Sequence, residues 1–215
     1  MNIEKPKIET DKIVVFLPGL SGGAMSDRFL PLVEACHQAG LAVVRATIWD
    51  NQEEVEKMSL NEIYKEVDDY VQKLKELGFN HIYGVGKSFG GAVMLTHSNL
   101  GAFEKKVLWA PAIRIDEAES NISQYLNTKL KDVSSLFEIK LNKQDLENFK
   151  TPTLVIHGTN DDNIPLSNSE VLISMLPEAK IVKIEGADHS YRNKDHESAV
   201  IKETVNFLTP WFIKL

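Results

Sequence analysis

The stretch HIYGVGKSFGG, residues 81–91, contains three overlapping glycine patterns that predict different chemistries. The letters GKS match the end of a phosphate-binding P-loop, and the first two glycines match the start of a dinucleotide-binding fingerprint. The P-loop also needs a glycine five positions before Gly86, where this chain has His81. The fingerprint needs one three positions after Gly86, where the chain has Phe89. A side chain at these positions hinders the tight backbone conformation that both patterns require.

The third pattern, G-x-S-x-G, is complete over residues 86–90. It predicts a nucleophile elbow, in which Ser88 lies on a sharp turn between a strand and a helix. The same residues are also compatible with a glycine-rich turn that carries an incidental serine. The rest of the chain must therefore supply the evidence for or against catalysis.

Composition limits the class of protein. The 215 residues suit a single α/β domain over 1–215, with 43% hydrophobic and 26% charged residues. A net charge of −7 argues against a nucleic-acid partner, because phosphates require a basic face. Cys36 is the single cysteine, so no intramolecular disulfide or thiolate metal site is expected. The first twelve residues are charged, and no apolar run approaches a membrane span, so we expect a cytoplasmic protein without membrane contact.

Short apolar runs alternate with longer amphipathic segments, which is typical of βαβ units and a parallel sheet. We expect strands over residues 13–17, 42–48, 81–85, 106–109, 153–157 and 180–184. We expect helices over about 26–38, 60–74, 90–98, 122–137, 167–175 and 196–208. Ser59 and Glu62 form a capping box at the start of the second helix. Most strand candidates are continuously apolar, which indicates that helices cover both faces of the sheet.

An acid and a base follow the last two expected strands. A serine nucleophile needs both groups, and they collect where parallel strands end. Asp161 follows the fifth strand in the loop HGTNDDNIP, and His189 follows the sixth in GADHS. The order Ser88, Asp161, His189 is nucleophile, acid, base, which is the order found on α/β-hydrolase sheets.

With these three loops in place, the chain resembles the α/β-hydrolase superfamily, and within it the small carboxylesterases similar to dienelactone hydrolases. The resemblance covers nearly the whole chain from Ile13 onward. It implies a minimal, mostly parallel sheet of about six strands with helices on both faces and little or no cap. In that family the acid follows a glycine by three residues and precedes a [VI]-P pair, which selects Asp161 over its neighbour Asp162.

The chain departs from the family at three points. Dienelactone hydrolases use a cysteine nucleophile where this chain has Ser88, and most family members have histidine where it has Lys87. Two antiparallel strands lead the family's sheet, but only twelve residues precede Ile13 here. His157 precedes the glycine at the end of the fifth strand and is expected to lie beside the catalytic residues rather than to be one of them.

The oxyanion hole and the substrate pocket complete the expected site. One oxyanion donor is the N–H of the residue after the nucleophile, Phe89. The resemblance of residues 17–23 to the family's H-G-x loop implies Leu20 N–H as the second. Met25, Trp109 and Tyr191 are candidate substrate-binding residues, and each is equally compatible with a place in the core.

The sequence thus predicts a serine hydrolase that cleaves small or accessible carboxylic esters through an acyl-enzyme intermediate, with no metal or organic cofactor. A peptidase or thioesterase of the same fold is the first alternative. A nucleotide-binding protein that uses residues 86–88 and a catalytically inactive binding module are more distant ones. The oligomeric state is left open.

Overall fold

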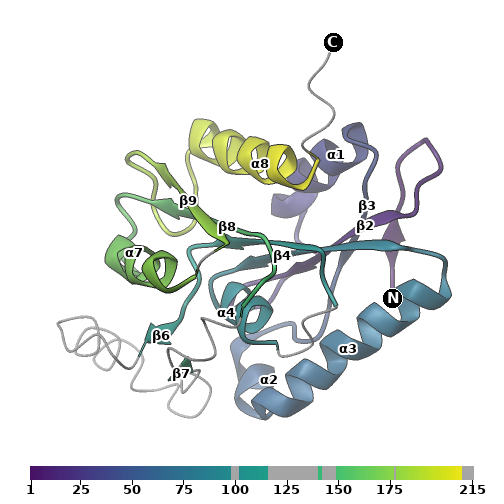
Figure 1. Cartoon of the computed structure of the whole chain (residues 1–215), viewed down its shortest axis with the longest axis horizontal. Helices are drawn as coiled ribbons and strands as arrows, with labels where there is room; N and C mark the ends of the chain where they lie inside the picture. The colour runs from purple at the N-terminus through teal and green to yellow at the C-terminus, as the bar shows by residue number, and fades with distance from the viewer. Residues whose placement is uncertain (98–101, 116–139, 142–148, 177, 210–215) are drawn as a thin grey trace.

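The computed structural model describes residues 1–97, 102–115, 140–141, 149–176 and 178–209 (Figure 1). Within them, the main sheet has seven strands in the spatial order β1-β3-β2-β4-β5-β8-β9. The strands are β1 (Ile3–Glu4), β2 (Lys12–Leu17), β3 (Ala42–Arg45), β4 (His81–Lys87), β5 (Lys105–Trp109), β8 (Thr153–Gly158) and β9 (Ala179–Ile184). β1 runs antiparallel to β3, and the other neighbouring pairs of this sheet are parallel. The predicted α/β-hydrolase fold with a mostly parallel sheet is confirmed.

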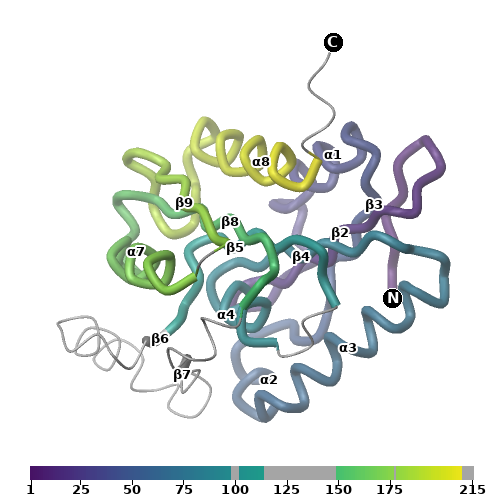
Figure 2. The backbone as a smooth tube through the Cα atoms, viewed as in Figure 1, coloured from purple at the N-terminus to yellow at the C-terminus, as the bar shows by residue number. Residues whose placement is uncertain are grey.

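Helices cover both faces of this sheet (Figure 1). They are η1 (Asp27–Phe29), α1 (Leu30–Gln38), α2 (Gln52–Glu56), α3 (Leu60–Glu76), α4 (Phe89–Thr96), α7 (Leu166–Met175) and α8 (Lys194–Leu208). α1 and α8 lie on one face, and α2, α3, α4 and α7 lie on the other. The tube in Figure 2 shows the same two layers around the central strands.

The alternation of side chains along each strand separates the core into two clusters. On β2, Val14 and Phe16 point to the face covered by α1 and α8, while Ile13, Val15 and Leu17 point to the face covered by α3 and α4. All five side chains are fully buried. A strand with helices on both faces must be apolar at every position, and this explains the continuous apolar runs of the sequence.

Helix α3 shows how local signals set the boundaries of an element. The Ser59 hydroxyl accepts the Glu62 N–H, and the Glu62 carboxylate accepts the Ser59 N–H, which completes the predicted capping box. Ile63, Val67 and Val71 follow at a spacing of four residues and are buried against the sheet. Gly78, with a φ of 90°, ends the segment in a conformation that favours glycine.

Two helices begin at residues other than those predicted. Ser26 accepts the Arg28 N–H and caps the short helix η1, while α1 itself begins at Leu30 with Pro31 in its first turn. Helix α7 begins at Leu166 after Pro165, so Ser167 lies inside the helix rather than at its cap. Pro31 is the second residue of α1 and Pro165 is the N-cap of α7, positions where the missing N–H of proline costs no intrahelical hydrogen bond.

Several short elements carry little sequence signal and were not predicted. They are α2, the edge strand β1, and a second, two-stranded sheet formed by β6 (Arg114–Ile115) and β7 (Lys140–Leu141). An ion pair holds β1 in place: Arg45 donates two hydrogen bonds to the Glu4 carboxylate, at 2.8 and 2.9 Å. β1 raises the main sheet from the expected six strands to seven.

The helix expected over 122–137 and the expected absence of a cap both concern residues outside those described. In the described part of the chain, no helix is both long enough and apolar enough to cross a membrane.

Candidate active site

Ser88 occupies a strained turn between β4 and α4. Its φ of 52° and ψ of −116° lie outside the regions that residues with a Cβ favour. The turn requires close packing, since a Cβ on Gly86 would lie 2.4 Å from the Gly90 carbonyl oxygen. A Cβ on Gly90 would lie 2.3 Å from the Pro18 carbonyl oxygen. Both glycines of the motif are therefore explained by the approach of α4 to β4 and to the loop after β2.

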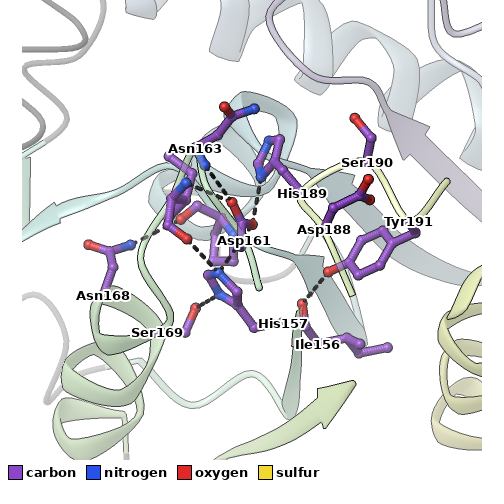
Figure 3. A network of polar contacts seen from close by, with 12 residues as sticks. Ile156, His157, Asp161, Asn163, Asn168, Ser169, Asp188, His189, Ser190 and Tyr191 are labelled. Carbon is purple, nitrogen blue, oxygen red and sulfur yellow. Dashed lines mark hydrogen bonds and ion pairs between the residues drawn. The ribbon is translucent and has the colours of Figure 1, made fainter. Parts of the chain in front are cut away.

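Asp161 lies in the loop after β8, where backbone N–H groups and two histidines hold its carboxylate (Figure 3). Oδ1 accepts the N–H groups of Asn163 at 2.9 Å and Ile164 at 2.8 Å. Oδ2 lies 2.7 Å from His189 Nδ1 and 3.3 Å from His157 Nε2. Burial opposes ionisation of Asp161, but the hydrogen bonds from His157 and His189 outweigh it and hold the pKa of this carboxyl well below its usual range. Asp161 is therefore ionised at neutral pH.

His189 lies in the loop after β9 and is 8% exposed. Its Nδ1 faces the Asp161 carboxylate and must carry a proton, because an ionised carboxylate can only accept. Nε2 is the ring nitrogen left to exchange a proton with a substrate or nucleophile. The neighbouring Asp188 accepts the N–H and Nε–H groups of Arg192 instead, and Asp162 is exposed. The geometry thus pairs His189 with Asp161 rather than with either neighbouring aspartate.

Parallel pairing brings Ser88 to the same edge of the sheet as this pair. The Ser88 N–H donates to the Trp109 carbonyl at 2.8 Å, at the end of β5, and the Ala110 N–H donates to the Ile156 carbonyl of β8 at 2.8 Å. The Asn160 N–H donates to the Ala187 carbonyl at 3.0 Å and connects the two loops that carry Asp161 and His189. Within the described residues, the Ser88 hydroxyl makes no hydrogen bond of its own.

The loop after β2 lies against Ser88, as a Cβ added to Gly19 would lie 3.5 Å from the Ser88 Cβ. The Gly19 carbonyl accepts the Gly22 N–H at 2.9 Å and the indole N–H of Trp49 at 2.9 Å. Trp49 also packs edge-on against Phe89, with ring centroids 5.4 Å apart. No motif or spacing in the sequence indicates that Trp49 anchors the loop after β2.

The two expected oxyanion donors lie on this loop and on α4. Within the described part of the chain, the Leu20 N–H makes no hydrogen bond to backbone or side chain. Phe89 is the first residue of α4 and directly follows Ser88. Both groups come from segments adjacent to Ser88, and their roles as oxyanion donors stay predictions.

The three candidate substrate-binding residues lie in different environments. Met25 is 40% exposed and remains a candidate. Trp109 and Tyr191 lie in the core, the other place that the sequence leaves open for them, since they are only 5% and 4% exposed and pack edge-on against each other beside α1 and α8. Trp109 Nε1 donates to Thr204 Oγ1, and the Tyr191 hydroxyl donates to the Ile156 carbonyl. Their polar atoms are thus satisfied inside the protein, which is typical of structural aromatic residues.

Lys87 precedes Ser88, and its side chain lies beside α1 and α8. It is 8% exposed and lines a cavity of about 20 Å³ with Arg28, Tyr191 and apolar side chains of α1 and α8. Burial and then the charge of Arg28 lower the pKa of Lys87 to about 8, although the charges of Asp161 and Asp188 favour its charged form. Among the described residues, Lys87 Nζ forms neither an ion pair nor a hydrogen bond. Arg28 itself donates to the Ser190 carbonyl and so connects η1 to the His189 loop.

A search of the described residues for three or more histidine, cysteine, aspartate or glutamate side chains arranged around a common metal position finds no such group.

Comparison with known proteins agrees with this arrangement. Residues 49–214 match the prolyl oligopeptidase family, Peptidase_S9. A curated relative, the "Uncharacterized peptidase YuxL" of Bacillus subtilis (strain 168), is 33% identical over 69 residues, which cover 30% of this chain but only 10% of that protein.

Solved structures share the fold at low sequence identity. Est1E from Butyrivibrio proteoclasticus has a TM-score of 0.74 at 17% identity, and the match covers 96% of this chain and 93% of that one. A monoacylglycerol lipase of Paleococcus ferrophilus has a TM-score of 0.74 at 18% identity, with 97% and 98% coverage. A dienelactone hydrolase from Anabaena variabilis has a TM-score of 0.70 at 18% identity, with 95% and 88% coverage. With the family match covering most of the chain, this protein belongs to the prolyl oligopeptidase family of α/β-hydrolases.

Proposed function

We propose that this chain is a serine hydrolase that cleaves small or accessible carboxylic esters, with Ser88 as nucleophile, His189 as general base and Asp161 as the orienting acid. The observation that carries the proposal is the 2.7 Å contact between Asp161 Oδ2 and His189 Nδ1, at the sheet edge where Ser88 is held on a strained elbow. The acid and the base are thereby aligned without a substrate. Membership of a hydrolase family supports the same reaction class.

In the acylation step, Ser88 Oγ attacks the carbonyl carbon of the ester while His189 Nε2 takes the hydroxyl proton. The buried, ionised Asp161 stabilises the imidazolium that forms and keeps the Nδ1 proton in place. The N–H groups of Leu20 and Phe89 hold the negative oxygen of the tetrahedral intermediate. The C–O bond to the alcohol then breaks, and the alcohol leaves with the proton from His189.

In the deacylation step, water replaces the alcohol. The water oxygen attacks the acyl carbon of the Ser88 ester while His189 Nε2 removes a proton from the water, and a second tetrahedral intermediate forms. Collapse of this intermediate breaks the bond to Ser88 Oγ, which recovers its proton from His189. The cycle releases a carboxylic acid and consumes one water, and it needs no metal or organic cofactor.

Esterase activity is the leading proposal, and peptidase activity is the second candidate. Similar structures include a monoacylglycerol lipase and a dienelactone hydrolase, which favours ester substrates. The family match and the relative with a peptidase name favour amide substrates. Both reactions use the same nucleophile, acid and base, so the site geometry is common to them.

A substrate panel separates these two candidates. We expect measurable kcat/KM on 4-nitrophenyl esters with short acyl chains, a decline with longer chains, and little cleavage of aminoacyl-prolyl 4-nitroanilides. Ser88→Ala should abolish every activity while the protein stays folded, because it removes one hydroxyl group and leaves the elbow backbone unchanged. Faster cleavage of the prolyl amides than of the short esters would replace the esterase proposal with the peptidase one.

A further inference from the structure

His157 lies directly behind Asp161, at the end of β8, and is fully buried (Figure 3). Its Nε2 lies 2.9 Å from the Ile164 carbonyl oxygen and 3.3 Å from Asp161 Oδ2. A carbonyl oxygen can only accept a hydrogen bond, so Nε2 must carry the proton. That single N–H is shared between the carbonyl and the carboxylate.

Ser169, on α7, holds the other side of the same ring. Its Oγ lies 2.7 Å from His157 Nδ1, and its side chain is fully buried. With the proton of the neutral ring on Nε2, Nδ1 accepts from the Ser169 hydroxyl. The acceptors around Nε2, the Ile164 carbonyl and the Asp161 carboxylate, select this tautomer, and the Ser169 hydroxyl holds the ring in place by donating to Nδ1.

Asp161 Oδ2 therefore accepts hydrogen bonds from two imidazoles, that of His157 at the end of β8 and that of His189 in the loop after β9. We propose that His157 and Ser169 are positioning residues, a role that rests on the function proposed above. The pair fixes the orientation of the Asp161 carboxylate and determines how strongly that carboxylate stabilises protonated His189. Neither residue touches the reacting atoms.

The direction of the effect follows from charge. The N–H of His157 withdraws part of the negative charge of Asp161 from His189, so the imidazolium is stabilised less than an unshared carboxylate would stabilise it. Asp161 keeps its bonds to Ile164 N and His189 without His157, so it stays ionised at neutral pH. Loss of the His157 N–H should therefore move the protonation midpoint of His189 to higher pH.

Three variants test this. His157→Met removes the N–H, and Ser169→Ala leaves the ring but removes the hydrogen bond that holds its Nδ1 side in place. His157→Gln keeps an N–H donor on a side chain of similar reach. We expect the midpoint of His189 protonation to rise by about half a pH unit or more in His157→Met, by less in Ser169→Ala, and to stay near the wild-type value in His157→Gln.

The midpoint is measured in two ways, by NMR titration of ¹⁵N-histidine-labelled protein and from the acid limb of kcat/KM on 4-nitrophenyl acetate. kcat should fall about tenfold in His157→Met because Asp161 Oδ2 loses one of the two hydrogen bonds that orient it toward His189. Substitution of a second buried histidine provides the control: His97→Gln, beside α3, should leave the midpoint unchanged. Other charged or titratable groups around His189 stay the same in all variants: Lys87, Asp188, Tyr191 and Arg28.

The NMR titration needs no turnover, so it separates the two proposals. If wild-type protein neither turns over esters nor reacts at Ser88, the proposed function fails while the titration still tests the role of His157. If Ser169→Ala and His157→Met both fold and titrate at the wild-type midpoint, the positioning role is overturned. Loss of thermal stability in these variants without a shifted midpoint would overturn it equally, since that is the signature of a structural role alone.

Discussion

Lys106 provides a quantitative test of the energetics of the fold. It lies on β5, is fully buried, and its Nζ has no hydrogen-bond partner among the described residues. The rings of Phe149 and Phe103 offer it cation–π contacts, with centroids 5.0 and 5.8 Å from Nζ. Burial lowers the pKa of Lys106 from 10.5 to about 7. The folded state therefore stabilises the neutral amine over the ammonium.

The size and sign of the effect follow from this shift. At 1.36 kcal/mol per pKa unit, the difference between 10.5 and about 7 corresponds to a penalty of up to about 5 kcal/mol when the amine is protonated in the folded state. Below pH 7 both the folded and the unfolded states bind the proton, and the full penalty applies. Between pH 7 and 10.5 only the unfolded state binds it, so this group makes the folded state more stable as pH rises.

Lys106→Met removes this group and fills the same space with an apolar side chain. We expect the variant to be more stable than wild type by roughly 2–5 kcal/mol at pH 6. The gain should shrink steadily as pH rises from 7 toward 10. The assay is urea unfolding of both proteins at several pH values, with exposed Lys202→Met on α8 as the control that should show no such dependence. A variant less stable than wild type at pH 6, or a difference independent of pH, would refute the reasoning.

Three further predictions concern the site. Asp161→Asn should lower kcat for ester hydrolysis by several orders of magnitude, because the amide favours the wrong tautomer of His189. Asp162→Asn should have little effect. The reverse result would show that the acid is misassigned. Lys87→Met should retain fluorophosphonate labelling. It should also unfold at a higher temperature at pH 7, since the lysine is buried and has no hydrogen-bond or ion-pair partner in the described part of the chain. Millimolar Mg-ATP should not shift the melting temperature of the wild-type protein. A nucleotide-dependent shift that Lys87→Met abolishes would instead support the phosphate-loop interpretation. Trp49→Phe, which removes the indole donor to Gly19, should lower kcat about tenfold with a smaller effect on KM, and unchanged kinetics would mean that the loop after β2 is held by other contacts.

The elements with strong periodic or capping signals were predicted from the sequence, and the short ones were not. The apolar run of β2 and the capping box of α3 reflect local preferences that act within a few residues. β1 has only two residues and depends on the ion pair between Glu4 and Arg45, 41 positions apart, so no local pattern indicates it. Lys106 is similar, because a charged residue beside an apolar run usually indicates a solvated end, whereas here the side chain packs against two aromatic rings.

In the candidate site, the sequence indicates the proposed catalytic residues more clearly than the residues that hold them in place. Ser88, Asp161 and His189 each follow a strand and belong to a short motif with glycine, so both residue type and position indicate them. Trp109 was a candidate for the substrate pocket, but residue type alone does not say which face of the sheet receives the ring. Trp49 contacts the loop around Gly19 only after β3 and β2 have paired, which makes its contribution a property of the tertiary structure.

Covalent labelling of Ser88 is the most direct test of the proposed catalytic site. Wild-type protein is treated with a fluorophosphonate and analysed by intact-mass and peptide mass spectrometry. We predict one adduct per chain, located on Ser88, and no adduct in Ser88→Ala, which should unfold at the wild-type temperature. An adduct that persists in Ser88→Ala, or folded wild-type protein that never reacts, would contradict the assignment of Ser88 as the nucleophile.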